Sequence, residues 1–142
     1  MKALAVAMLL LGICALVRPF WDEEYEDGAA HSIAVNYAIY RNEVFHYVYR
    51  HKGVTGTIQL SSLAMPATWH GLRAWRARVE DGRCYVYGEA TQEEIAAVRD
   101  LFRGSFAVGM ASKGTLIPVL GSAIPVPGFI PDGSLVSITE VE

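Results

Sequence analysis

Cys84 is the residue whose type and neighbours could most directly support chemistry. It lies in the stretch RVEDGRCYVYGEATQEEI, residues 78–95, with arginines before it, two tyrosines after it and glutamates further on. A cysteine beside basic groups can have a lowered pKa and act as a nucleophile. The stretch therefore poses two alternatives: a reactive thiol with acid–base partners, or a strand, a turn and the beginning of a helix.

The order of residue types in this stretch favours the structural alternative. An Asp-Gly pair at residues 81–82 is a hairpin signal, which predicts that a strand over residues 76–80 pairs with the residues that follow. Residues 83–88 alternate, so Cys84 and Val86 point to one face of a strand and the two tyrosines to the other. A free cysteine on an apolar strand face behaves as a small hydrophobic residue.

The carboxylates that follow are explained by the N-terminus of a helix. Thr91 and Glu94 form a T-x-x-E capping box, and apolar residues at helical spacing continue to Phe102, just before Gly104. Negative charges are favourable in the first turn of a helix. The sequence therefore predicts a helix here, and no pair of catalytic carboxylates.

The rest of the chain offers little that indicates a reaction. No metal-binding, nucleophile-elbow or phosphate-loop motif surrounds the four histidines, His31, His46, His51 and His70, or the serines. The net charge is −3 and the basic residues are dispersed, which argues against nucleic-acid binding. We predict a protein that is not an enzyme and that has no cofactor, no metal, no nucleic-acid partner and no small-molecule substrate.

The first 21 residues are strongly apolar. Lys2 precedes the apolar run 3–17 and Arg18 follows it. The run is short for a membrane anchor, and the residues after it match a signal-peptide cleavage site poorly. We favour an uncleaved single-pass anchor over residues 1–21, with a cleaved signal as the alternative. Either alternative exports the rest of the chain: an acidic spacer over residues 22–28, then one domain over residues 29–142.

Cysteine usage fits a domain that is held together by packing alone. Cys14 is the only other cysteine, and it lies inside the apolar run. Cys84 therefore has no partner for a disulfide in the exported domain.

Residues 29–52 are predicted to form a long amphipathic helix. Its apolar stripe recurs at steps of four and three: Ile33, Tyr37, Tyr40, Val44 and Tyr47. A helix normally buries such a stripe against another element. Tyrosine is also enriched at interfaces, so a partner-binding surface is the alternative, with Tyr37, Tyr40, Arg41 and Tyr47 as its candidate residues.

The remaining segments complete an α+β fold. Further strands are predicted over residues 55–63, 106–111, 115–119 and 134–141. Residues 121–133 are predicted to form a long exposed loop, and Pro125, Pro127 and Pro131 are its candidate interface residues. The expected order is an N-terminal membrane helix, a long amphipathic helix, and then a small, mostly antiparallel sheet with one further helix.

Several segments together resemble a known family. In order, they are NYAIYRNEVFHYVY, GTIQLSSLAMP followed by a tryptophan, GRCYVYG, VGMASKGTLIPV and GSLVSI, spanning Asn36 to Ile138. They resemble PilM of the conjugative-plasmid type IVB thin-pilus systems, which is distinct from the longer, actin-like PilM. The residues that match are Tyr40, Arg41, Asn42, Tyr85, Val86, Tyr87, Gly88, Gly114, Pro118 and Gly133.

This resemblance implies a role in type IV pilus biogenesis at the inner membrane or in the periplasm, and it supplies no catalytic residues. The expected function is therefore a membrane-anchored periplasmic scaffold that contacts other pilus-assembly proteins. Two alternatives stay open: a minor pilin-like subunit of the fibre, and a periplasmic thiol enzyme that uses Cys84.

Overall fold

The computed structural model of the chain describes residues 28–141. The predicted anchor, residues 1–21, and the predicted spacer up to residue 27 lie outside the described residues. Within residues 28–141, no helix has the length and the apolar composition that crossing a membrane requires.

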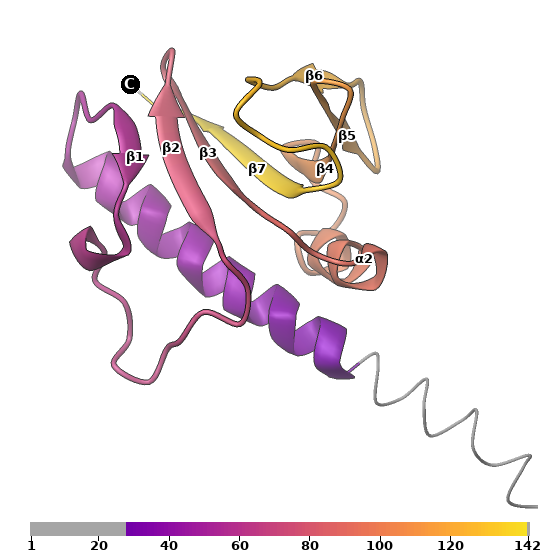
Figure 1. Cartoon of the computed structure of the whole chain (residues 1–142), viewed down its shortest axis with the longest axis horizontal. Coiled ribbons are helices and arrows are strands. Elements are labelled where there is room, and N and C mark those ends of the chain that lie inside the picture. Colours follow the sequence, from indigo (N-terminus) through magenta and orange to yellow (C-terminus); the bar gives the residue numbers. More distant parts are fainter. Residues whose placement is uncertain (1–27, 142) are drawn as a thin grey trace, which may run out of the picture.

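A long helix over residues 28–50 opens the described part of the chain and runs along one face of a sheet (Figure 1). It forms because its apolar positions recur at helical spacing, and the predicted stripe is largely buried: Ile33, Tyr37, Tyr40 and Val44. The helix ends two residues earlier than predicted, ahead of Gly53, whose φ is +78°.

Seven strands form one sheet in which every neighbouring pair is antiparallel, so the predicted α+β fold is confirmed for this part of the chain. Their order across the sheet is β1-β2-β3-β7-β4-β5-β6. Their bounds are β1 Gly56–Ile58, β2 Arg76–Glu80, β3 Arg83–Gly88, β4 Val108–Ser112, β5 Thr115–Pro118, β6 Ile124–Pro125 and β7 Leu135–Glu140.

Helix α2, Gln92–Leu101, begins with the predicted capping box. The Thr91 side chain accepts a hydrogen bond from the Glu94 N–H, and the Glu94 carboxylate accepts one from the Thr91 N–H, 2.9 Å away. Glu94 is buried and also forms a salt bridge with Arg73, so the cap ties α2 to the segment before β2.

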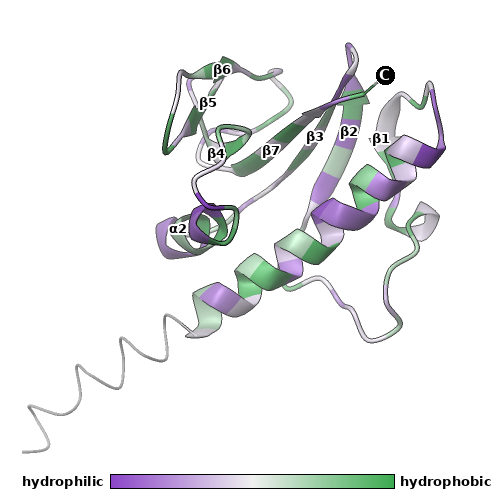
Figure 2. Ribbon diagram, turned by 180° about the vertical axis from the view of Figure 1, so that it is seen from behind, coloured by the Kyte–Doolittle hydropathy of each residue, from purple (hydrophilic) through white to green (hydrophobic). Residues whose placement is uncertain are grey.

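The two faces of the sheet bury two separate cores. The helix-side core combines the long helix and α2 with residues such as Cys84 and Val86 of β3. The second core contains the alternate residues Tyr85 and Tyr87, as the period of two in the sequence predicted. Figure 2 shows the hydrophobic colouring of β7, in the middle of the sheet, and the mixed hydropathy of the long helix.

The Pro-rich segment does not form the exposed loop that we predicted over residues 121–133. It contributes β6, and it packs Val126, Phe129 and Ile130 onto the second core. The reason is that apolar residues interleave with its prolines and cover a sheet face on which neither helix packs.

The first strand is shorter than the prediction of residues 55–63. β1 covers only Gly56–Ile58, and Leu60–Ser62 form a 3-10 helix. Ile58 pairs with Ala77, next to the first residue of β2, so a longer β1 would have almost no partner along that edge.

Candidate functional site

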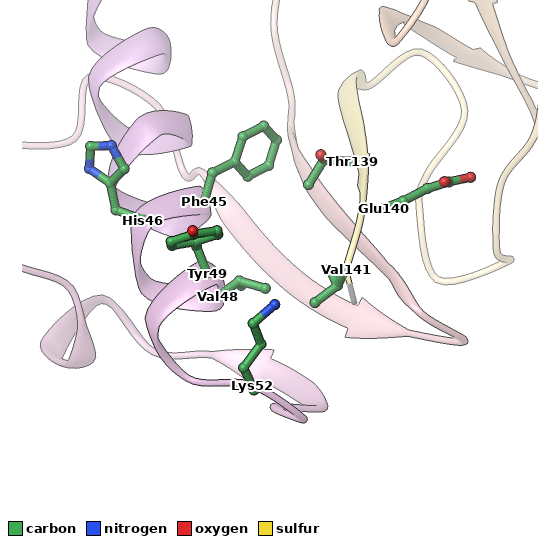
Figure 3. Close-up of a pocket in the computed structure, with 8 residues that line it drawn as sticks. All are labelled: Phe45, His46, Val48, Tyr49, Lys52, Thr139, Glu140 and Val141. Atoms are coloured by element: carbon green, nitrogen blue, oxygen red, sulfur yellow. The ribbon is translucent and has the colours of Figure 1, made fainter.

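A groove lies between the C-terminal half of the long helix and the end of β7 (Figure 3). Its volume is about 440 Å³. Eight residues line it: Phe45, His46, Val48, Tyr49, Lys52, Thr139, Glu140 and Val141.

The helical wall of the groove follows from residue spacing. Three residues follow Phe45 at distances of three, four and seven positions: Val48, Tyr49 and Lys52. This spacing places all four on one helix face. Val48 is buried against the helix-side core, whereas the Tyr49 side chain is 77% exposed. The floor is therefore apolar and fixed, and the outer rim is accessible to a partner.

The opposite wall is the last part of β7 and the residue after it. The Val141 N–H donates a hydrogen bond to the Gly82 carbonyl, 2.8 Å away, which holds the chain end against the β2–β3 turn. Figure 3 shows Val141 pointing toward Val48 and Lys52, and Glu140 pointing away from the helix. The Lys52 ammonium also lies 5.5 Å from the centre of the Tyr49 ring, so the rim combines an aromatic face with a positive charge.

The Cys84 side chain is fully buried on the helix side of the sheet, as the alternation in β3 predicted. Burial raises the pKa of its thiol to about 12, although Arg41 nearby acts in the opposite direction. The thiol is therefore protonated at neutral pH and inaccessible, which is the environment of a packing residue and not of a nucleophile.

Two of the residues predicted as interface candidates are core residues, and the partner-surface interpretation is wrong for them. Tyr37 and Tyr40 are buried because their helix face covers the sheet. The Tyr37 hydroxyl lies 2.9 Å from the Val86 carbonyl and 2.7 Å from the Ser137 hydroxyl. The Tyr40 ring stacks on Trp69, with 5.9 Å between ring centres.

The other two candidates on the long helix are only partly buried. The Arg41 guanidinium lies between two aromatic rings, 4.2 Å from the centre of Phe45 and 4.5 Å from that of Phe102. Burial lowers the pKa of Arg41. Its position joins the long helix to the end of α2, which is a structural contact. Tyr47 is half-buried and stacks on His51, at 4.2 Å between ring centres.

The three candidate prolines lie on the other side of the sheet from the long helix. Pro125 and Pro131 are exposed and Pro127 is half-buried, along the segment that covers the second core. None of the seven predicted interface residues lines the groove. The spacing of Phe45, Val48, Tyr49 and Lys52 was the available signal for it, but the contribution of β7 was not visible in the sequence.

Metal binding finds no support in the described part of the chain. Among residues 28–141, no three histidine, cysteine, aspartate or glutamate side chains are grouped so that they could hold a metal ion.

Comparison with known proteins relates the chain to one family. The model of the PilM family matches residues 6–138. A crystal structure of a PilM protein from Escherichia coli B7A has a similar fold, with a TM-score of 0.61 at 20% sequence identity. The similarity covers 79% of this chain and 92% of that chain. A search of curated proteins gives no match.

Proposed function

The chain belongs to the PilM family and is a component of a pilus system, and we propose that it is a membrane-anchored periplasmic scaffold for pilus assembly. In this proposal residues 1–21 are a single-pass anchor in the inner membrane, and residues 29–142 form the periplasmic domain. The domain acts by contact with other pilus-assembly proteins. The family match supports the pilus role, and the apolar run at residues 3–17 supports the anchor.

One surface feature carries the scaffold proposal. Three large apolar side chains stay exposed near the end of α2, and we call them the apolar cluster: Phe106 at 67%, Val119 at 56% and Leu120 at 66% exposure. Gly121 lies close to Phe106, and Gly104 lies close to both Val119 and Leu120, so the turn after α2 and the segment after β5 bring the three side chains together. Grouped apolar side chains on a protein surface are typical of sites that bind another protein.

The inert thiol also favours contact over chemistry. The one cysteine in the described residues is sealed in the core with a raised pKa, so it does not supply a nucleophile. The domain presents the apolar cluster at its surface, and exposed apolar patches are typical of sites that bind another protein.

A clean deletion tests the pilus role directly. We expect the deletion strain to lose its pili while it still synthesises pilin, and we expect the protein to co-purify from membranes with other pilus-assembly proteins. A wild-type number of pili in the deletion strain refutes the proposal. Recovery of the protein from sheared pili by mass spectrometry identifies it as a fibre subunit instead.

The apolar cluster is tested by replacing Leu120 with glutamate in the complemented strain. We expect fewer pili at an unchanged level of the protein, because a charge there opposes burial at an interface. Leu60→Glu is the matched control, since Leu60 is 51% exposed and lies in the 3-10 helix beside β1. The intact mass of the protein from membranes decides between the anchor and a cleaved signal.

A further inference from the structure

Strand β7 extends beyond its neighbour β4. Their ladder pairs Val108 with Ser137, and its last bond runs from the Ile138 N–H to the Ala107 carbonyl, at 2.9 Å. The chain before Ala107 then turns away, because the Ser105 N–H bonds to a carbonyl at the end of α2. Past Ile138, β7 therefore has a neighbouring strand on the β3 side and none on the β4 side, within residues 28–141.

The backbone of Glu140 faces this open side. The Val141 N–H points toward the β2–β3 turn, where it bonds to Gly82, whereas the Ile138 N–H points toward β4. Successive residues of a strand direct their backbone groups to alternate edges. The N–H and carbonyl of Glu140 therefore point to the side that β4 has left, and no backbone bond among residues 28–141 occupies that side of Glu140.

A hollow lies on each face of the sheet at this point. The groove beside the long helix is one of them. The other, with a volume of about 460 Å³, lies on the opposite face and includes Phe106, Ile124 and Ile138. Both hollows contain Thr139 and Glu140, so they meet at the open end of β7. An extended strand sends successive side chains to opposite faces, so one strand added here would reach both hollows.

We propose that this notch, formed by the open backbone of Glu140 and the two hollows, binds an extended segment of a partner protein by strand addition. The inference rests on the proposed function, that the chain works by protein contact. The partner backbone pairs with Glu140. One partner side chain enters the groove beside the long helix, and the next enters the hollow at Phe106.

Charge and continuity specify the occupant further. Lys52 lies at the rim of the first hollow and Arg83 in the second, and neither is in an ion pair with another of residues 28–141. Glu140 lies opposite Arg83 in the β3–β7 pair, and its side chain points away from the long helix, so Lys52 is the positive charge that Glu140 does not face. A partner segment with a carboxylate next to the apolar residue that enters the first hollow matches this arrangement. Phe106 belongs both to the second hollow and to the apolar cluster, so a partner seated in the notch also covers part of that cluster.

The first test locates the partner segment in cells that carry the complete pilus system. A photo-crosslinking amino acid replaces Tyr49 at one hollow or Phe106 at the other, and Leu60 is the exposed control position. We expect both notch positions to capture the same short segment of one partner, as mapped by mass spectrometry, and Leu60 not to capture it. Capture of unrelated segments at the two positions, of a second copy of this chain, or only at Leu60 overturns the proposal.

The second test removes the backbone donor. Glu140→Pro deletes the N–H that faces the notch and leaves the bond between Val141 and Gly82 possible, whereas Glu140→Gln keeps the N–H. A synthetic peptide of the crosslinked segment should bind Glu140→Pro at least about tenfold more weakly than wild type, and Glu140→Gln within about twofold. Equal binding by all three proteins overturns strand addition.

Where Glu140→Pro does not fold, hydrogen exchange in the wild-type protein replaces it. The Glu140 amide should exchange quickly in the free protein and at least about tenfold more slowly when the peptide is bound. Unchanged exchange at this amide overturns the proposal. If the deletion strain loses its pili but these binding tests fail, only the notch proposal is rejected. If the deletion strain keeps a wild-type number of pili, the proposed function is rejected.

Discussion

The hydrogen bonds of Tyr37 connect the long helix to the two central strands, so their removal should be costly. The Val86 carbonyl can only accept, so the Tyr37 hydroxyl donates to it and accepts from the Ser137 hydroxyl. All three residues are buried. Tyr37→Phe leaves the Ser137 hydroxyl without this partner and keeps the ring that packs edge-on against Trp75 at 4.9 Å. The Val86 carbonyl keeps a partner in the sheet, because Val86 and Ser137 face each other at a hydrogen-bonded position of the β3–β7 pair.

The expected cost combines one unsatisfied hydroxyl with one lost hydrogen bond. The unsatisfied Ser137 hydroxyl should cost about 1–3 kcal/mol and the lost bond to Val86 about 0.5–1.5 kcal/mol, so we expect Tyr37→Phe to lower the free energy of unfolding by roughly 1.5–4 kcal/mol. Ser137→Ala leaves Tyr37 bonded to Val86 and should cost about 0.5–1.5 kcal/mol. The double variant leaves no hydroxyl unsatisfied, so its cost should be smaller than the sum of the single costs by about 1 kcal/mol.

Urea unfolding of the full chain in a mild detergent, followed by tryptophan fluorescence, measures these differences. Tyr49→Phe is the control, because Tyr49 is 77% exposed and its hydroxyl has no hydrogen bond within residues 28–141; its effect should stay below about 0.5 kcal/mol. Strict additivity of the two core substitutions, or a cost of Tyr37→Phe no larger than that of Tyr49→Phe, would refute this reasoning.

Three further predictions concern packing, capping and pH. Gly109→Ala should prevent normal folding, as seen by thermal unfolding, because its new Cβ would lie 2.2 Å from the Ile117 carbonyl oxygen, whereas Gly128→Ala has open space and should be neutral. Thr91→Ala should cost about 1 kcal/mol in urea unfolding, since it removes the cap of α2. Burial raises the pKa of Cys84 to about 12. The thiol therefore does not lower the free energy of unfolding below about pH 9, where it is protonated in the unfolded chain as well. Above about pH 9 the unfolded thiol ionises, and the free energy of unfolding falls as the pH rises toward 12. In Cys84→Ala, the urea concentration at the midpoint of unfolding should begin to fall only at about pH 10, where tyrosines begin to ionise in the unfolded chain.

Local patterns predicted the elements that depend on local chemistry. The Thr91–Glu94 box predicted the start of α2, and the alternation at residues 83–88 assigned Cys84 to the correct face. The hairpin at residues 81–82 formed where the Asp-Gly pair indicated, with φ of +50° and +73°. These features depend on neighbours within a few positions, which a single sequence displays.

Features that depend on distant partners were not predictable in the same way. Asn36 is an example: its side chain binds the His70 carbonyl, the Leu72 N–H and the indole of Trp75, and so fastens the segment before β2 to the long helix. Nothing near Asn36 in the sequence shows those partners. The groove also depends on residues far apart in the sequence, because its walls come from residues 45–52 and 139–141.

The two outer borders of the sheet limit one route to self-association. β6 is two residues long and its second residue is Pro125, which lacks an N–H, while β1 at the far border has three residues. Each border therefore presents very little backbone on which another chain could stack. We expect this protein to resist polymerising through its strand edges, even at high concentration.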